Sequence, residues 1–180
     1  AAPRTPTPGS TESADVLTRP RLERDLLGRR VHVVRAGAGF GKTTLVAGWA
    51  ESVPSVLVGL TPAHRAVSTL ARALFDGLRL RVPGLGAPLS TILSDATDLV
   101  PDPTALAAEF GGRLAVHLVR DLVLVLDNVD ELDGSDGAVL LDGLVRHAPE
   151  QLHFVLAGRS DPPVRLSRLR VAGAVDDLDA

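Results

Sequence analysis

Short apolar runs alternate with segments of helical periodicity along the whole chain. Four runs predict buried strands, because β-branched residues and leucine fill most positions: 31–35 (VHVVR), 55–60 (SVLVGL), 122–126 (LVLVL) and 152–157 (LHFVLA). Residues 175–178 are a candidate for a fifth strand, and run 122–126 is the most apolar and is expected to be central. Strands that alternate with helices favour a mainly parallel sheet with helices on both faces.

Apolar positions three and four residues apart predict the helices between these strands. The clearest pattern covers 63–81, where Val67, Leu70, Leu74 and Leu78 fall on one face. Further helices are expected at 20–28, 42–51, 103–119, 137–147 and 164–171, with a short one near 89–95 inside the irregular stretch 82–102. In the helix at 103–119, the adjacent Gly111 and Gly112 are expected to weaken the helix.

The 180 residues are sufficient for one domain. Residues 1–18 are rich in Ala, Pro, Thr and Ser and lack periodicity, which is typical of a linker or terminus, so the domain is expected to cover 19–180. Methionine is absent, even at position 1, which favours a fragment of a longer protein.

Composition excludes several classes of site. Without cysteine there can be no disulfide or thiolate metal site. A net charge of −3 and 3% aromatic residues predict neither a basic face nor a stacking surface for nucleic acid. Neither a membrane-spanning run nor a signal peptide is present, so a cytoplasmic location is expected, with no membrane partner.

A glycine-rich loop follows the first strand and precedes a helix. Glycines let successive backbone N–H groups approach phosphate oxygens, and the helix N-terminus attracts the same anion. In such a P-loop the lysine reaches the β- and γ-phosphates and the hydroxyl residue binds Mg²⁺. Lys42 is the single lysine beside eighteen arginines, and the pattern departs only at its first glycine; the residues are Ala36, Gly37, Ala38, Gly39, Phe40, Gly41, Lys42 and Thr43.

An acid ends the most apolar strand. Asp127 follows run 122–126, the arrangement in which a carboxylate at a strand tip holds Mg²⁺ beside a P-loop. The next residue, Asn128, can orient a water molecule but cannot accept its proton. Asp130 and Glu131 follow closely and could substitute for the missing acid. The sequence therefore predicts slow hydrolysis and a nucleotide-held switch.

Arginines and acids near the last strands are further candidates. Arg159 comes directly after strand 152–157, so it lies at the carboxyl edge of the sheet, where it either senses the γ-phosphate or is a solvated loop residue. The arginines of the next helix are expected on a solvated face, with a partner surface as the alternative: Arg165, Arg168 and Arg170. Ser160 and Asp161 are expected to cap that helix, and Asp176, Asp177 and Asp179 to form an exposed edge.

Together these residues resemble the nucleotide-binding domain of STAND-class signalling ATPases, in particular the large ATP-binding LuxR-type transcriptional regulators that include the maltose-regulon activator. Four stretches carry the resemblance, and together they span most of residues 17–178: 17–26 (LTRPRLERDL), 36–50 (AGAGFGKTTLVAGWA), 122–132 (LVLVLDNVDEL) and 153–170 (HFVLAGRSDPPVRLSRLR). The last is the more specific, with its small residue and arginine after the strand, then a proline pair.

The resemblance implies a three-layer P-loop NTPase fold of the AAA and STAND type, with five mainly parallel strands and with strand 152–157 between the P-loop strand and the Asp127 strand. It implies that Arg19, Pro20 and Leu22 lie near the adenine, and that the loop from Ala36 to Thr44 holds the phosphates.

The same resemblance implies ATP or ADP with Mg²⁺ as the cofactors. Thr43 and Asp127 would hold the metal and Arg159 would sense the γ-phosphate, with Lys42 and Asn128 as the other catalytic candidates. Many of these regulators carry a second aspartate where this chain has Asn128, and the stretch 61–64 lacks the acidic turn often found there.

The implied function is a regulatory switch with weak ATPase activity. Its partners would be the other domains of the parent chain, which would self-associate when ATP is bound and would bind DNA through a separate helix-turn-helix outside these residues. Two alternatives stay open, a P-loop kinase or motor ATPase and a degenerate nucleotide-binding scaffold, and the residues do not exclude GTP.

Overall fold

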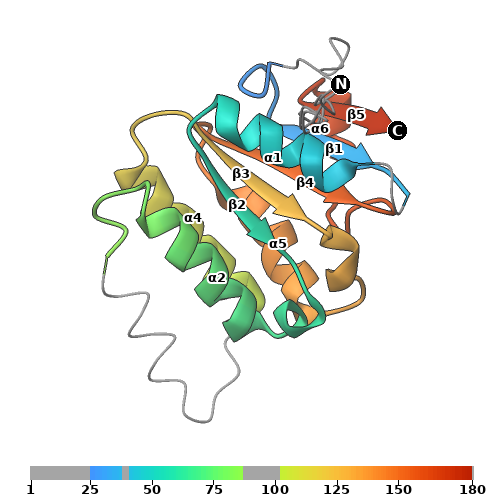
Figure 1. Cartoon of the computed structure of the whole chain (residues 1–180). Coiled ribbons are helices and arrows are strands. Elements are labelled where there is room, and N and C mark those ends of the chain that lie inside the picture. The colour runs from blue at the N-terminus through green and yellow to red at the C-terminus, as the bar shows by residue number, and fades with distance from the viewer. Residues whose placement is uncertain (1–24, 38–40, 87–101, 180) are drawn as a thin grey trace, which may run out of the picture.

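Five parallel strands form one sheet (Figure 1) in the computed structural model, which describes residues 25–37, 41–86 and 102–179. They are β1 (Val31–Arg35), β2 (Ser55–Gly59), β3 (Leu122–Asp127), β4 (Leu152–Gly158) and β5 (Val175–Asp179). Their order is β2-β3-β4-β1-β5, and every neighbouring pair is parallel. The expected separation of β1 and β3 by β4 is confirmed. The middle position belongs to β4 rather than β3, although all residues of both strands are buried.

Five α-helices and two 3₁₀ turns connect the strands within the described ranges. They are α1 (Lys42–Ser52), η2 (Pro62–Arg65), α2 (Val67–Arg79), α4 (Pro103–His117), η3 (Val129–Leu132), α5 (Asp136–His147) and α6 (Ser167–Val171). No helix in the described parts is both long and apolar enough to cross a membrane.

Alternating side chains of the strands build two cores, one on each face of the sheet. Leu122, Leu124 and Leu126 of β3 pack into the larger core, which also takes in the apolar faces of α2, α4 and α5. Val123 and Val125 point to the other face, which α1 covers with Val46 and Trp49 (Figure 1). The helices on both faces confirm the expected three-layer α/β architecture, and fully buried strands explain why β3 reads as a continuous apolar run.

Two predicted helices differ from the structure at their starts. The helix expected at 63–81 is divided, because Pro62 opens a 3₁₀ turn and Ala66 is extended (φ −77°, ψ 129°), so that α2 begins at Val67. The helix expected from 164 begins at Ser167, since the chain around Pro162-Pro163 is not helical. The one expected at 89–95 lies outside the described residues, as does most of that at 20–28, whose last residues 25–28 form a turn.

The helix pair α4 and α5 packs closely through small residues. A Cβ atom on Gly111 would lie 2.6 Å from the carbonyl oxygen of His147, and one on Gly143 would lie 2.5 Å from the Cβ of Ala107. A Cβ on Gly112 would meet nothing within 4 Å. Gly111 is thus required for the close packing of α4 against α5. The sequence predicts only that the glycines weaken the helix.

Candidate functional site

The residues predicted to contact phosphate and Mg²⁺ lie where β1, β3 and β4 end. The backbone N–H of Ala36 donates to the carbonyl oxygen of Gly158 (3.1 Å), which holds the start of the glycine-rich loop against β4. Gly41, with φ 76°, immediately precedes α1, a left-handed conformation that glycine adopts without strain. Of the predicted loop residues, Ala38, Gly39 and Phe40 lie outside the described residues, and so do Arg19, Pro20 and Leu22.

Four side chains from α1 and the end of β3 form one cluster, in which Lys42 and Asp127 are buried, Asn128 is half-buried and Thr43 is exposed. The Lys42 ammonium lies 3.4 Å from Oδ1 of Asp127 and donates to Oδ1 of Asn128 (3.3 Å). The hydroxyl of Thr43 donates to the other oxygen of Asp127, Oδ2, at 2.7 Å. Lys42 is 9% and Asp127 4% exposed, so their charges are paired away from bulk water. The structure therefore brings together Lys42, Thr43, Asp127 and Asn128; Thr44, the next residue of α1, is exposed.

The backbone at Asn128 is unusual. Its φ of 61° makes it the one non-glycine residue with a positive φ among the described residues. Asparagine tolerates this left-handed conformation better than most residues. The turn directs its amide oxygen to Lys42, while its backbone N–H donates to Oδ1 of Asp127 (2.9 Å). Asn128 thus orients both members of the buried ion pair, a role that the sequence pattern alone did not predict.

Arg159 lies at the rim of this site, on the loop after β4. Its backbone N–H donates to Oδ1 of Asp130 (3.1 Å), and its Nε lies 4.0 Å from Oδ2 of the same carboxylate. A Cβ on Gly158 would lie 2.9 Å from Oδ1 of Asp130, so glycine at this position leaves room for the carboxylate. The guanidinium is 63% exposed, and its ion pair is with Asp130 rather than with a residue of the Lys42 cluster. Asp130 therefore links the loop after β3 to the loop after β4.

Arg35, which the sequence analysis did not single out, anchors the end of β1. Its guanidinium binds Asp179 (Nε to Oδ1, 2.6 Å), Asp161 (2.5 Å) and Asp177 (3.1 Å). These hydrogen bonds raise the pKa of Arg35 above its ordinary range. Asp177 and Asp179 are exposed, as expected for this edge, and they are also ion-paired. Asp161 binds Arg35 and does not cap α6, which begins at Ser167. The network fixes the strand end that leads into the glycine-rich loop.

This network predicts a loss of stability in acid. Hydrogen bonding to Arg170, and then the charge of Arg35, lowers the pKa of Asp177, and hydrogen bonding to Arg35 lowers that of Asp179. A carboxyl group with a lowered folded-state pKa stabilises the fold above the unfolded pKa of about 3.9 and loses that contribution as the pH falls through its folded value. We expect the Tm to fall as the pH is lowered below about 5. In Arg35→Gln the fall should be shallower, measured by circular dichroism; an unchanged pH slope would argue against the network.

The oxygen atoms at the site fit a hard divalent cation bound together with phosphate. Mg²⁺ prefers oxygen ligands and is usually held by one or two protein groups plus substrate phosphates and water. The Thr43 hydroxyl and the Asp127 carboxylate are such groups, and they already lie within hydrogen-bond distance of each other. No group of three or more His, Asp or Glu side chains in the described ranges is arranged to hold a metal by itself.

Two curated proteins match most of the chain. The "HTH-type transcriptional regulator MalT" of Serratia proteamaculans is 29% identical over 146 residues, which cover 79% of this chain and 16% of that protein. The protein of the same name from Yersinia enterocolitica is 26% identical over 153 residues, which cover 83% and 16%. This chain is similar in sequence to the MalT regulators. The resemblance inferred from the sequence is therefore confirmed, and the chain spans about a sixth of each MalT protein, while no family model matches it.

Solved structures support the fold. A structure of Drosophila ORC bound to GC-rich DNA and Cdc6 matches with a TM-score of 0.52 at 14% identity, covering 86% of this chain and 50% of that chain. A second structure, of Drosophila ORC bound to DNA, matches with a TM-score of 0.50 over 86% and 81%. At this identity the likeness is one of fold alone. The fold of this chain is the three-layer α/β fold of P-loop ATPases.

Proposed function

We propose that this chain is the ATP- and ADP-binding switch domain of a MalT-like transcriptional regulator. The observation that carries the proposal is the cluster in which Lys42 and Thr43, at the start of α1, meet Asp127 at the end of β3. It joins a lysine after a glycine-rich loop to a strand-end acid, the pairing of Walker A and Walker B motifs in P-loop ATPases. The relationship to the MalT proteins supports a STAND-type role in signal transduction.

Different residues are proposed to contact different parts of the nucleotide. The loop from Ala36 to Thr44 would hold the phosphates, and the segment with Arg19, Pro20 and Leu22 would lie against the adenine. Lys42 now donates to the uncharged amide of Asn128. A phosphate oxygen carries negative charge and would compete well for that ammonium, because charge-assisted hydrogen bonds are the stronger ones.

Thr43 and Asp127 would hold Mg²⁺, which would neutralise phosphate charge at the β- and γ-positions. The groups that contact Asp127 are a lysine side chain, a hydroxyl and a backbone N–H. The hydroxyl of Thr43 can rotate to present a lone pair in place of its proton.

Slow hydrolysis follows from the residues after Asp127. Asn128 cannot take a proton from an attacking water. Asp130, the nearest following acid, is committed to the backbone N–H of Arg159. We therefore propose a weak ATPase, and turnover of many ATP molecules per second by the chain would contradict this assignment.

A switch requires that ATP and ADP bind with different affinities in the two arrangements of the parent protein. Arg159 is the residue proposed to sense the γ-phosphate, and Asp130 is the positioning residue that holds its loop. ATP binding would favour self-association of the parent and DNA binding through its separate helix-turn-helix, in the cytoplasm.

The sensor assignment predicts a selective loss. Arg159→Ala should weaken ATP binding by about tenfold while leaving ADP binding unchanged, since one charge-assisted bond to the γ-phosphate is lost. Asp130→Ala should produce a smaller effect of the same kind, and Asp130→Asn, which keeps an acceptor oxygen, should restore most of it. Isothermal titration calorimetry with both nucleotides tests this, with Arg72→Ala on α2 as the control. An equal loss for ATP and ADP would show that Arg159 is not a γ-phosphate sensor.

A further inference from the structure

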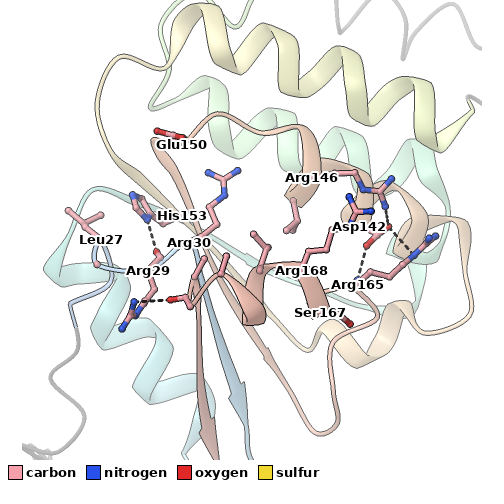
Figure 2. A pocket seen from close by; sticks show the side chains of 16 residues that line it. Leu27, Arg29, Arg30, Asp142, Arg146, Glu150, His153, Arg165, Ser167 and Arg168 are labelled. Atoms are coloured by element: carbon pink, nitrogen blue, oxygen red, sulfur yellow. Dashed lines mark hydrogen bonds and ion pairs between the residues drawn. The ribbon is translucent and has the colours of Figure 1, made fainter.

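A hollow of about 1040 Å³ lies at the end of the sheet opposite to the Lys42 cluster (Figure 2). It is bounded by α5, α6 and the segments that lead into β1 and β4, so it faces the amino ends of the strands. The cluster around Lys42 lies at their carboxyl ends. This hollow is therefore separate from the proposed nucleotide site, and the inference drawn from it does not depend on that site.

Arginines outnumber acids on the α5–α6 side of the hollow. The backbone N–H of Arg165 donates to Oδ1 of Asp142 (2.8 Å), and its Nε lies 3.5 Å from Oδ2. Arg146, one turn further along α5, forms an ion pair with the same Oδ2. Arg168 of α6 also lines the hollow, and its side chain forms no hydrogen bond or ion pair with any described residue (Figure 2). We call these four residues the α5–α6 arginine groove.

One carboxylate cannot neutralise three guanidinium groups, so the groove carries an excess of positive charge in a chain whose net charge is −3. Asp142 is buried, and its side chain is 11% exposed, whereas the side chain of Arg165 is 85% exposed. Asp142 therefore contacts the guanidinium groups of Arg146 and Arg165 from the inner side, while these side chains stay 52% and 85% exposed and can still meet a ligand. Exposed guanidinium groups in a concave site recognise carboxylates and phosphates in a bidentate manner.

Arg30, on the other wall, has a different role. It donates to the carbonyl oxygens of Ala148 and Leu152 (2.6 Å each), and of Pro149, and it lies 5.5 Å from the centre of the Phe154 ring. Burial lowers the pKa of its guanidinium. Arg30 thus caps the end of α5 and is not available to a ligand.

The remaining lining is partly apolar. Val145 and Leu169 line the α5–α6 side, and Leu27 lines the side near His153 (Figure 2). Such a surface fits the mixed carboxyl and apolar side chains of a protein segment better than a sugar-phosphate backbone. The low content of aromatic residues, 3%, and the negative net charge also disfavour nucleic acid. We propose that the α5–α6 arginine groove docks an acidic protein segment that carries apolar side chains between its carboxylates.

The test is fluorescence anisotropy with a labelled peptide of repeated Glu-Glu-Leu units. We expect salt-sensitive binding to the 180-residue chain that weakens by about tenfold or more in Arg168→Glu. The substitution removes the guanidinium that would pair with a carboxylate of the peptide and adds a negative charge that repels the peptide. The matched control is Arg72→Glu on α2, because Arg72 is also an exposed helical arginine whose side chain has no hydrogen bond or ion pair to the described residues. Arg168→Ala should show an intermediate loss, and thermal unfolding checks that each variant folds.

The competing occupants are separated by two further probes. A single-stranded oligonucleotide of equal charge should bind more weakly than the peptide, and inorganic phosphate at millimolar concentration should not displace the peptide. The proposal is overturned if the peptide does not bind, if Arg72→Glu weakens it as much as Arg168→Glu does, or if oligonucleotide or phosphate competes on equal terms.

Discussion

Replacement of Lys42 by alanine should abolish the thermal stabilisation that ATP or ADP gives to this chain. A ligand at 100 times its dissociation constant stabilises the state that binds it by about 2.7 kcal/mol, or about 5–10 °C in Tm for a domain of this size. Lys42 supplies the ammonium closest to the strand-end acid, 3.4 Å from Asp127. Loss of that charge should remove the shift, while the chain itself stays folded.

The measurement is thermal unfolding with ATP, ADP and GTP, each with and without Mg²⁺. Each variant is compared with its own nucleotide-free sample, because Lys42→Ala also breaks the buried ion pair with Asp127. Arg113→Ala is a suitable control, since the one ion pair that Arg113 forms with a described residue is with Glu109 of the same helix, α4. A shift that persists in Lys42→Ala, or the absence of any shift in the unaltered chain, would contradict the proposed site; a shift with GTP of equal size would contradict the adenine preference.

The sheet was predictable from sequence because its strands are buried on both faces. Every residue of β3 and β4 is buried, so each strand appears in the sequence as an apolar run with a clear end. In β3 that end is marked by the acid at position 127. The contact of Thr43 with Asp127 could also be expected, because parallel strands and the helix after β1 bring both to one edge of the sheet. The strand order came from the resemblance to AAA-type ATPases, since periodicity contains no information about which strands are neighbours.

Other features depend on contacts between distant residues and had no local signal. Asp130 contacts Arg159 across two loops, and Arg35 binds three acids more than 120 residues away. The interruption at Ala66 follows from a turn that begins at Pro62, which apolar spacing did not reveal because Val67 and its successors keep the helical pattern. The sequence therefore located the charged side chains near strand ends but did not reveal which of them form ion pairs.

The adjacent glycines of α4 should respond in opposite directions to alanine. Gly112 is exposed, and a methyl group there would meet nothing within 4 Å, so Gly112→Ala should stabilise the chain by about 0.5–1 kcal/mol through its better helix propensity. A methyl group on Gly111 would lie 2.6 Å from the oxygen and 2.7 Å from the carbon of the His147 carbonyl. Because both atoms belong to the backbone of α5, a helix rather than a side chain must move.

Overpacking of this kind costs about 1–3 kcal/mol, which exceeds the gain in helix propensity. Gly111→Ala should therefore lower the Tm, by up to about 10 °C at 2–4 °C per kcal/mol for a domain of this size, while Gly112→Ala raises it slightly. Chemical denaturation of the two variants side by side gives the same comparison as free energies of unfolding. Because both substitutions add one methyl group to the same helix, propensity alone would make both stabilising. Only the close approach of α5 to Gly111 separates them, so two stabilised variants would show that α4 and α5 are not packed at this distance.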